Sequence, residues 1–187
     1  MPTPRMRRPE KPADYLNIIS RAVFSAGLSW AAIDAKWDAF EEAFDGFEPA
    51  KVAHFDATDV ERLAADPRLL RSPRKVSATV DNAKALLAIE REYGSIRAWL
   101  DSFESYAQAA KDVSARFKYL SKTFGAYYFL YIADAKIRDF PTFEAWSKQT
   151  GEEHPRMREL VGKMNGTIGF ESEPGKLTSF SFTLPRA

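Results

Sequence analysis

The sequence predicts an all-α fold with a small β-hairpin at its C-terminal end. Apolar residues recur at helical spacing along the chain as far as Gly166. The later segment LTSFSFTL instead alternates apolar and polar residues, and the turn signal EPGK stands before it. The chain has 187 residues, of which 45% are hydrophobic, so it is long enough to bury a core. We therefore expect packed helices first and a hairpin at residues 168–184.

The N-terminal part predicts a loose arm followed by two helices. Residues 1–12 are rich in proline and arginine and are interpreted as a flexible basic arm, with residues 13–187 as a single domain. The first helix is expected to end near Ala26, because its apolar residues Tyr15, Ile18, Ile19 and Ala22 share one face. Ser29 is the expected N-cap of the second helix, whose apolar stripe is Ile33, Trp37, Phe40 and Phe44.

The later helices are predicted from their start and stop signals. Thr58 and Glu61 fit a capping box, and Ser72 followed by Pro73 is a strong helix start. Gly94 should end that helix, and Ser95 should begin the next. A further pair of helices is expected within RFKYLSKTFGAYYFLYIADAK, and Pro155 is expected to open the last helix.

Composition excludes several classes of function. The chain has 27 Lys and Arg against 26 Asp and Glu, so its net charge argues neither for nor against nucleic acid. It has no cysteine, which excludes disulfides, thiolate metal sites and a cysteine nucleophile. With two histidines, a multi-histidine metal site is not expected, and we predict no metal and no cofactor. We see no membrane-spanning run and no signal peptide, which favours a cytoplasmic protein without a membrane partner.

The stretch FSAGLSW, at residues 24–30, joins the first two predicted helices. Gly27 marks a corner, and Leu28 stands at its tip. One interpretation is an ordinary turn with Leu28 packed in the core. The other is a corner that displays an apolar side chain at the surface.

The segment from FSAGLSW to DNAKALL resembles the DNA-3-methyladenine glycosylase I family. The resemblance lies in four pieces that keep the family's order and spacing: AGLSW, AFDGFEPAKVA, DVERL and LLRSPRKVSATVDNA. It implies the two-lobed helix-hairpin-helix DNA glycosylase fold. It also implies base-excision repair on double-stranded DNA that contains a damaged base, by a nucleoid-associated protein that we expect to be a monomer.

The resemblance also implies roles around the damaged base. Leu28 matches a DNA wedge, which offsets part of the cost of extruding a nucleotide. Trp30 matches the base pocket, where an aromatic ring stacks on the purine; core packing beside Trp37 is its alternative. The predicted pocket also includes Ala22, Phe24, Tyr127 and Tyr128. The two tyrosines either line the cleft or pack their helix.

Two groups of residues are predicted to bind the DNA backbone. RFKYLSKTFGAYYFLYI resembles the family's DNA-anchoring hairpin, which assigns Lys118, Ser121, Lys122 and Thr123 to phosphates. Ser121 stands where the family usually has glycine. A second cluster at the predicted helix start contains Arg68, Arg71, Arg74 and Lys75. For each cation, an ordinary solvated surface position is the alternative.

The sequence departs from the family where activity is concerned. The family has a glutamate at the position of Ala22, and Ser25 replaces a glutamine. The family's N-terminal Tyr-His-Asp segment and its zinc ligands are also missing. An aspartate after the hairpin gives electrostatic help in related enzymes, so Asp139 and Asp134 are the catalytic candidates, with surface or capping roles as the alternative. The predicted function is therefore excision of a 3-methyladenine-like base, and the alternative is a non-catalytic DNA-binding homologue.

Overall fold

The computed structural model describes residues 9–26, 30–150, 167–171 and 179–183. The chain divides into two compact units, one made of residues 8–140 and the other of residues 1–7 and 141–187. The larger unit contains helices α1 to α9. The flexible arm over residues 1–12 and the single domain over residues 13–187 stay predictions.

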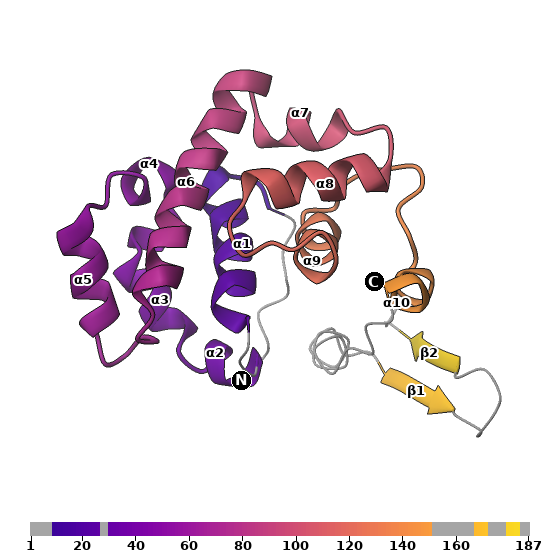
Figure 1. The fold of residues 1–187 in the computed structure, drawn as a ribbon, viewed down its shortest axis with the longest axis horizontal. Coiled ribbons are helices and arrows are strands. Elements are labelled where there is room, and N and C mark those ends of the chain that lie inside the picture. Colours follow the sequence, from indigo (N-terminus) through magenta and orange to yellow (C-terminus); the bar gives the residue numbers. More distant parts are fainter. Residues whose placement is uncertain (1–8, 27–29, 151–166, 172–178, 184–187) are drawn as a thin grey trace. The chain divides into compact units, whose positions relative to one another are not determined.

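Helices α1 (Pro12–Ser25) and α6 (Pro73–Tyr93) pack side by side at the centre of the larger unit (Figure 1). Each buries one apolar stripe, and Leu16, Ile19 and Val23 of α1 are fully buried. Helix α1 is followed by Ala26 as its C-cap, which confirms the predicted end. Helix α6 ends at Gly94, whose φ of 81° lies in the left-handed region that favours glycine, as predicted.

Short helices follow α1, and one prediction about them is wrong. The expected single helix is divided into α2 (Trp30–Asp34) and α3 (Trp37–Ala43), although Ile33, Trp37, Phe40 and Phe44 are all buried as expected. The 3-10 helix η1 (Asp45–Phe47), α4 (Pro49–Val52) and α5 (Ala57–Ala65) come next. Helices α4 and α5 both pack against α6.

The capping box of α5 also lies elsewhere than predicted. Asp56, not Thr58, is the N-cap, and its carboxylate accepts hydrogen bonds from the backbone N–H groups of Thr58 and Asp59. A carboxylate is as good an N-cap as a hydroxyl, and the sequence offers both within three positions.

The other side of the unit is formed by α7 (Ile96–Asp101), α8 (Tyr106–Arg116) and α9 (Phe124–Ile132). Ser95 caps α7 by accepting a hydrogen bond from the N–H of Ala98, as predicted. Helix α9 packs against both α1 and α8 (Figure 1). The turn between α8 and α9 therefore belongs to the same packed unit as α1 and α6.

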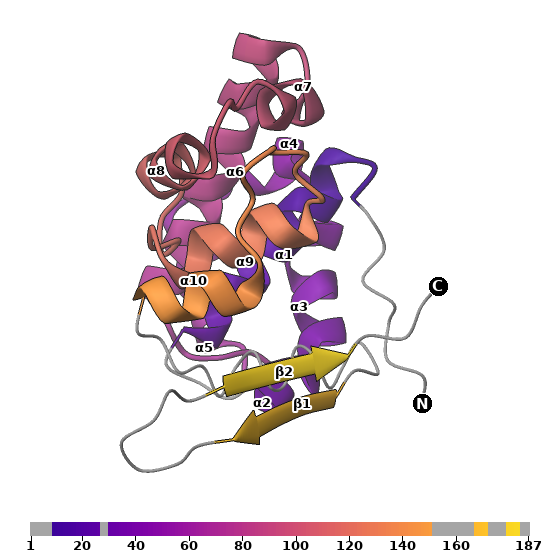
Figure 2. The ribbon, with the colours of Figure 1, turned by 90° about the vertical axis from the view of Figure 1, so that its right-hand side faces the viewer.

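The smaller unit contains α10 (Phe143–Thr150) and a two-stranded antiparallel sheet. Strand β1 (Thr167–Glu171) pairs with β2 (Ser179–Thr183), with Ile168 opposite Phe182 (Figure 2). This confirms the predicted hairpin, whereas α10 was not predicted. The helix expected from Pro155 lies outside the described residues. Within the described ranges, no helix is long and apolar enough to cross a membrane.

Candidate nucleic-acid interface

The C-terminal end of α1 is held by Lys75, from the first turn of α6. The ammonium of Lys75 donates hydrogen bonds to the carbonyl oxygens of Phe24, at 3.0 Å, and Ala26, at 2.7 Å. The last carbonyls of a helix lack helical partners and carry partial negative charge, so a cation stabilises them. Lys75 thus fixes α1 at the point where the segment 27–29 begins.

Asn82, two turns further along α6, holds the turn that follows α8. Its side-chain oxygen accepts a hydrogen bond from the backbone N–H of Lys118, at 2.7 Å. Its amide nitrogen donates to the carbonyl of the same residue, at 3.2 Å. Asn82 is fully buried, and the paired hydrogen bonds match the donor and the acceptor of one peptide unit.

The predicted hairpin segment 118–123 lies directly on the start of α9. A Cβ atom added at Gly125 would stand 2.6 Å from Cα of Leu120, so glycine is needed for this close approach of two backbones. The Ser121 hydroxyl accepts a hydrogen bond from the N–H of Gly125. Lys118, Ser121 and Lys122 are exposed, and Thr123 is half-buried. The main chain of the segment is thus anchored on α6 and α9, while its polar side chains face solvent.

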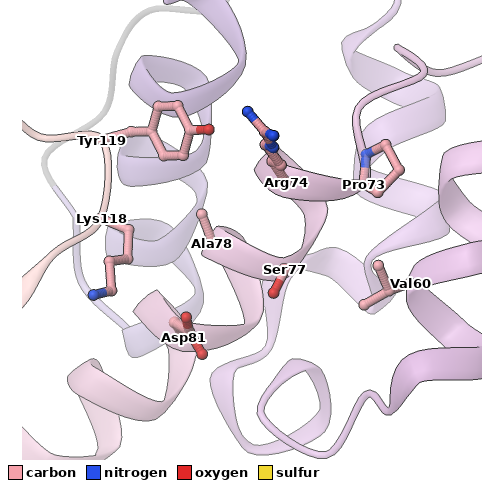
Figure 3. Close-up of a pocket in the computed structure, with 8 residues that line it drawn as sticks. All are labelled: Val60, Pro73, Arg74, Ser77, Ala78, Asp81, Lys118 and Tyr119. Carbon is pink, nitrogen blue, oxygen red and sulfur yellow. The ribbon is translucent and has the colours of Figure 1, made fainter.

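A groove of about 730 Å³ lies between this segment and α6 (Figure 3). It brings together two of the predicted DNA-binding residues, Arg74 and Lys118, with Asp81 and Tyr119. Arg71 and Lys122 are exposed but are not among the residues that line it. Tyr119 and Asp81 were not predicted as site residues.

The predicted base-pocket residues on α1 are buried. Ala22 is 7% exposed, and Phe24 is fully buried with its ring 4.5 Å from that of Phe40. Trp30 is the first residue of α2. Leu28 lies outside the described residues. The roles assigned to these residues stay predictions.

The two predicted pocket tyrosines, Tyr127 and Tyr128, are buried in α9. The ring of Tyr127 packs against Tyr131 and Phe140, and the ring of Tyr128 against Phe124. Burial raises the pKa of both phenols above the ordinary value, so both stay protonated and neutral near pH 7.

The two catalytic candidates lie after α9 and have intramolecular partners. The Asp139 carboxylate accepts a hydrogen bond from the N–H of Tyr106, the first residue of α8, at 2.7 Å. The Asp134 carboxylate lies 2.6 Å from the ammonium of Lys136. Neither aspartate lines the groove in Figure 3.

A polar cluster beside Ala22 was not predicted from the sequence. Arg21 donates to Asp34 at 2.6 Å and to Asn17 at 3.3 Å, and its guanidinium lies 4.4 Å from the ring centre of Trp37. Asn17 also accepts from the Trp37 indole and donates to Glu41. Burial lowers the pKa of Arg21 from its ordinary value. The spacing of Asn17 and Arg21, one turn apart on α1, was the available signal.

Comparisons with known proteins show the family to which the chain belongs. A family described as methyladenine glycosylase matches residues 11–126. The DNA-3-methyladenine glycosylase of Haemophilus influenzae is 35% identical over 88 residues, which cover 47% of this chain and 48% of that protein. DNA-3-methyladenine glycosylase 1 of Escherichia coli K12 is 39% identical over 66 residues, 35% of each chain. The chain thus spans about half or less of the length of these relatives.

Solved structures extend the similarity to the fold. The 3-methyladenine DNA glycosylase I of Staphylococcus aureus has a TM-score of 0.59 at 29% identity and covers 72% of this chain and 84% of that one. A tyrosine-to-phenylalanine variant of 3-methyladenine DNA glycosylase I, solved in complex with 3-methyladenine, has a TM-score of 0.58 at 29% identity. It covers 72% of this chain and 85% of that one. The range matched by the family ends within α9, before Asp134 and Asp139.

Proposed function

Because the chain belongs to the methyladenine glycosylase family, we propose that it binds double-stranded DNA and excises an alkylated, 3-methyladenine-like base. The observation that carries this proposal is the arrangement around α6. Lys75 and Asn82 hold the main chain of the two segments that the family resemblance assigns to the base and to the DNA backbone. Both segments fall within the range matched by the family.

The proposed reaction is hydrolysis of the N-glycosidic bond. The bond between C1′ of the sugar and the base nitrogen breaks, its electron pair leaves with the base, and water adds to C1′ with loss of a proton. An N-alkylated purine is cationic and is already a good leaving group. The protein therefore needs mainly to extrude the nucleotide, hold the base and stabilise positive charge on the sugar.

Each step has a proposed residue. Leu28 fills the space left in the duplex, and Trp30 stacks on the extruded base. Exposed Lys118 and Lys122 contact phosphates from the anchored turn before α9. Lys75 acts through the carbonyl oxygens of Phe24 and Ala26, and thereby positions the end of α1, which precedes Leu28 in the sequence.

Asp139 and Asp134 remain the candidates for stabilising the charged sugar. Asp139→Asn is a sharp test, because asparagine keeps an oxygen that accepts the hydrogen bond from Tyr106 and loses only the charge. If Asp139 acts in catalysis, the single-turnover rate falls about 100-fold without loss of fold. An unchanged rate assigns Asp139 to the capping of α8 alone, and Asp134→Asn is then the matched second variant.

The experiment that tests the function is release of free base, measured by mass spectrometry, from methylated and ethenylated duplex DNA. Leu28→Ala should release no base while still folding.

A second function is favoured by one observation: Ala22 presents a buried methyl group where the family has a glutamate. DNA binding without base release supports that second function, a non-catalytic DNA-binding homologue. In that case Ala22→Glu, if it folds, is the variant in which excision is expected to appear.

A further inference from the structure

Tyr119 is held in an unusual conformation beside the groove. Its φ of 64° lies in the left-handed region that residues other than glycine rarely adopt. Such conformations persist only where the surroundings fix them. Here the preceding residue, Lys118, is bonded through both backbone groups to Asn82, and the following residue, Leu120, is buried against Gly125. The backbone of Tyr119 is therefore fixed on both sides.

The fixed backbone presents the Tyr119 ring to solvent. Tyr119 is 47% exposed, the largest exposure of any large hydrophobic residue in the part of the chain that the structure describes. The aromatic ring borders the groove opposite α6 (Figure 3). A single exposed aromatic residue is ordinary on a protein surface. A strained backbone is more often found at binding sites, so the conformation of Tyr119 at the edge of the groove points to a ligand.

The charged side chains that line the groove have no partner within the described part of the protein. Among the described residues, Arg74, Lys118 and Asp81 make no side-chain hydrogen bond or ion pair. Other arginines of the larger unit are paired with carboxylates, including Arg62, Arg68, Arg97 and Arg116. The groove thus offers two cations, one carboxylate and one aromatic face.

We propose that this groove holds one unpaired nucleotide of the DNA, with its base stacked on Tyr119 and its phosphate against Arg74 and Lys118. Stacking on an aromatic side chain together with cationic contact to the backbone is the usual recognition of unpaired nucleotides. The Asp81 carboxylate can accept a hydrogen bond from an amino group on the edge of the base. A free phosphate ion has no such amino group, so Asp81 favours a nucleotide over phosphate alone. This proposal rests on the proposed DNA binding and adds a nucleotide site to the base-binding role proposed for Trp30.

The test uses two undamaged duplexes, one fully paired and one with a single bulged cytosine, in fluorescence anisotropy. The parent protein should bind the bulged duplex more tightly. Tyr119→Ala should weaken binding to the bulged duplex by about 5- to 150-fold and leave binding to the paired duplex nearly unchanged. Tyr119→Phe should keep the preference, because the ring is retained. The thermal midpoint of Tyr119→Ala should match that of the parent, since alanine adopts the same φ at similar cost.

Tyr131 is the matched control, because it is the other exposed large aromatic residue of the described part, at 40%, and does not line the groove. Tyr131→Ala should bind both duplexes like the parent protein. Arg74→Gln with Lys118→Gln should lower the salt slope for the bulged duplex by about 2. Equal affinities of the parent and Tyr119→Ala for the bulged duplex would overturn the groove proposal and leave base release intact. Failure to bind either duplex would overturn the proposed function as well.

Discussion

Lys75 and Asn82 stand two turns apart on α6, and each secures the main chain of another segment, but by different means. At the α1 end, one half-buried ammonium on a long flexible stem reaches two carbonyl oxygens. At the hairpin end, a fully buried neutral amide pairs with both backbone groups of Lys118, and two backbones touch at Gly125. An ammonium can exchange a carbonyl for water, whereas a buried amide has no such substitute. The contrast indicates an adaptable contact at the end of α1 and a fixed one at the segment before α9.

The largest loss of stability is expected from Asn82→Ala. It leaves the N–H and carbonyl of Lys118 without their partner and should lower the free energy of unfolding by about 2–3 kcal/mol. Urea denaturation measures the change. The matched control is Asp81→Ala, the exposed neighbour on the same helix, which should stay within about 0.5 kcal/mol of the parent. Equal losses in the two variants would mean that the amide contact is not special.

A smaller loss is expected from Gly125→Ala. In an open helix this change stabilises a protein by roughly 0.5–1 kcal/mol, because glycine is the poorer helix former. Here the new Cβ meets backbone atoms of Leu120, and the forced shift should destabilise the protein by about 1–3 kcal/mol. The sign of the change, read from the urea midpoint, decides the question. A more stable variant would show that the hairpin segment is free to move.

At the end of α1, the corresponding variant is Lys75→Met. Loss of the cation from the C-terminal end of α1 should lower the free energy of unfolding by about 1–2 kcal/mol. The slope of DNA affinity with salt should not change, because the ammonium is bonded to carbonyls. Lys122→Met is the matched variant on the exposed turn. It should leave stability unchanged and reduce the salt slope by about 1. If Lys75→Met lowered the salt slope and Lys122→Met lowered stability, Lys75 would be the phosphate contact and Lys122 the structural one.

The smallest effect is expected from the loss of one exposed ion pair in acid, at the end of α8. Arg116, the last residue of α8, forms an ion pair with Glu92 of α6, at 2.8 Å. The hydrogen bond from Arg116 holds the pKa of Glu92 below its ordinary value. A carboxyl whose pKa is lowered by folding stabilises the protein above its unfolded pKa, near 4.3, and loses that contribution as the pH falls through the folded pKa. Glu92→Gln should flatten the fall in thermal midpoint below about pH 4, and an unchanged profile would show that the exposed pair contributes nothing.

Local signals in the sequence predicted much of the fold. Gly94 and Ser95 mark a helix end and a helix start by their own chemistry, and both predictions are confirmed. The alternation at Phe180 and Phe182 predicted the strand in which they lie. The break between α2 and α3 was missed because Ile33, Trp37, Phe40 and Phe44 keep helical spacing across it. Burial by tertiary packing does not require one continuous helix.

The site was less predictable because its contacts join distant positions. Lys75 was assigned to DNA from its place in a basic cluster, yet its ammonium reaches carbonyls about fifty positions earlier in the sequence. Asn82 gave no pattern of its own, since a lone asparagine in a helix has many possible partners. Tyr119 became notable only through its backbone conformation and exposure. Such features depend on which segments meet, and spacing along the chain does not encode that.

The cluster around Arg21 has an evolutionary consequence. Its guanidinium relies on Asp34 of α2 and Asn17 of α1, and Asn17 is shared with Trp37. A mutation at Asp34 alone removes the ion-pair partner of a mostly buried cation, which is more costly than replacing the arginine and the aspartate together. Substitutions at these positions should therefore be correlated, so that related sequences without the arginine also lack the aspartate. Substitution patterns among related sequences would then record where α2 docks on α1, even in chains whose active-site motif has decayed.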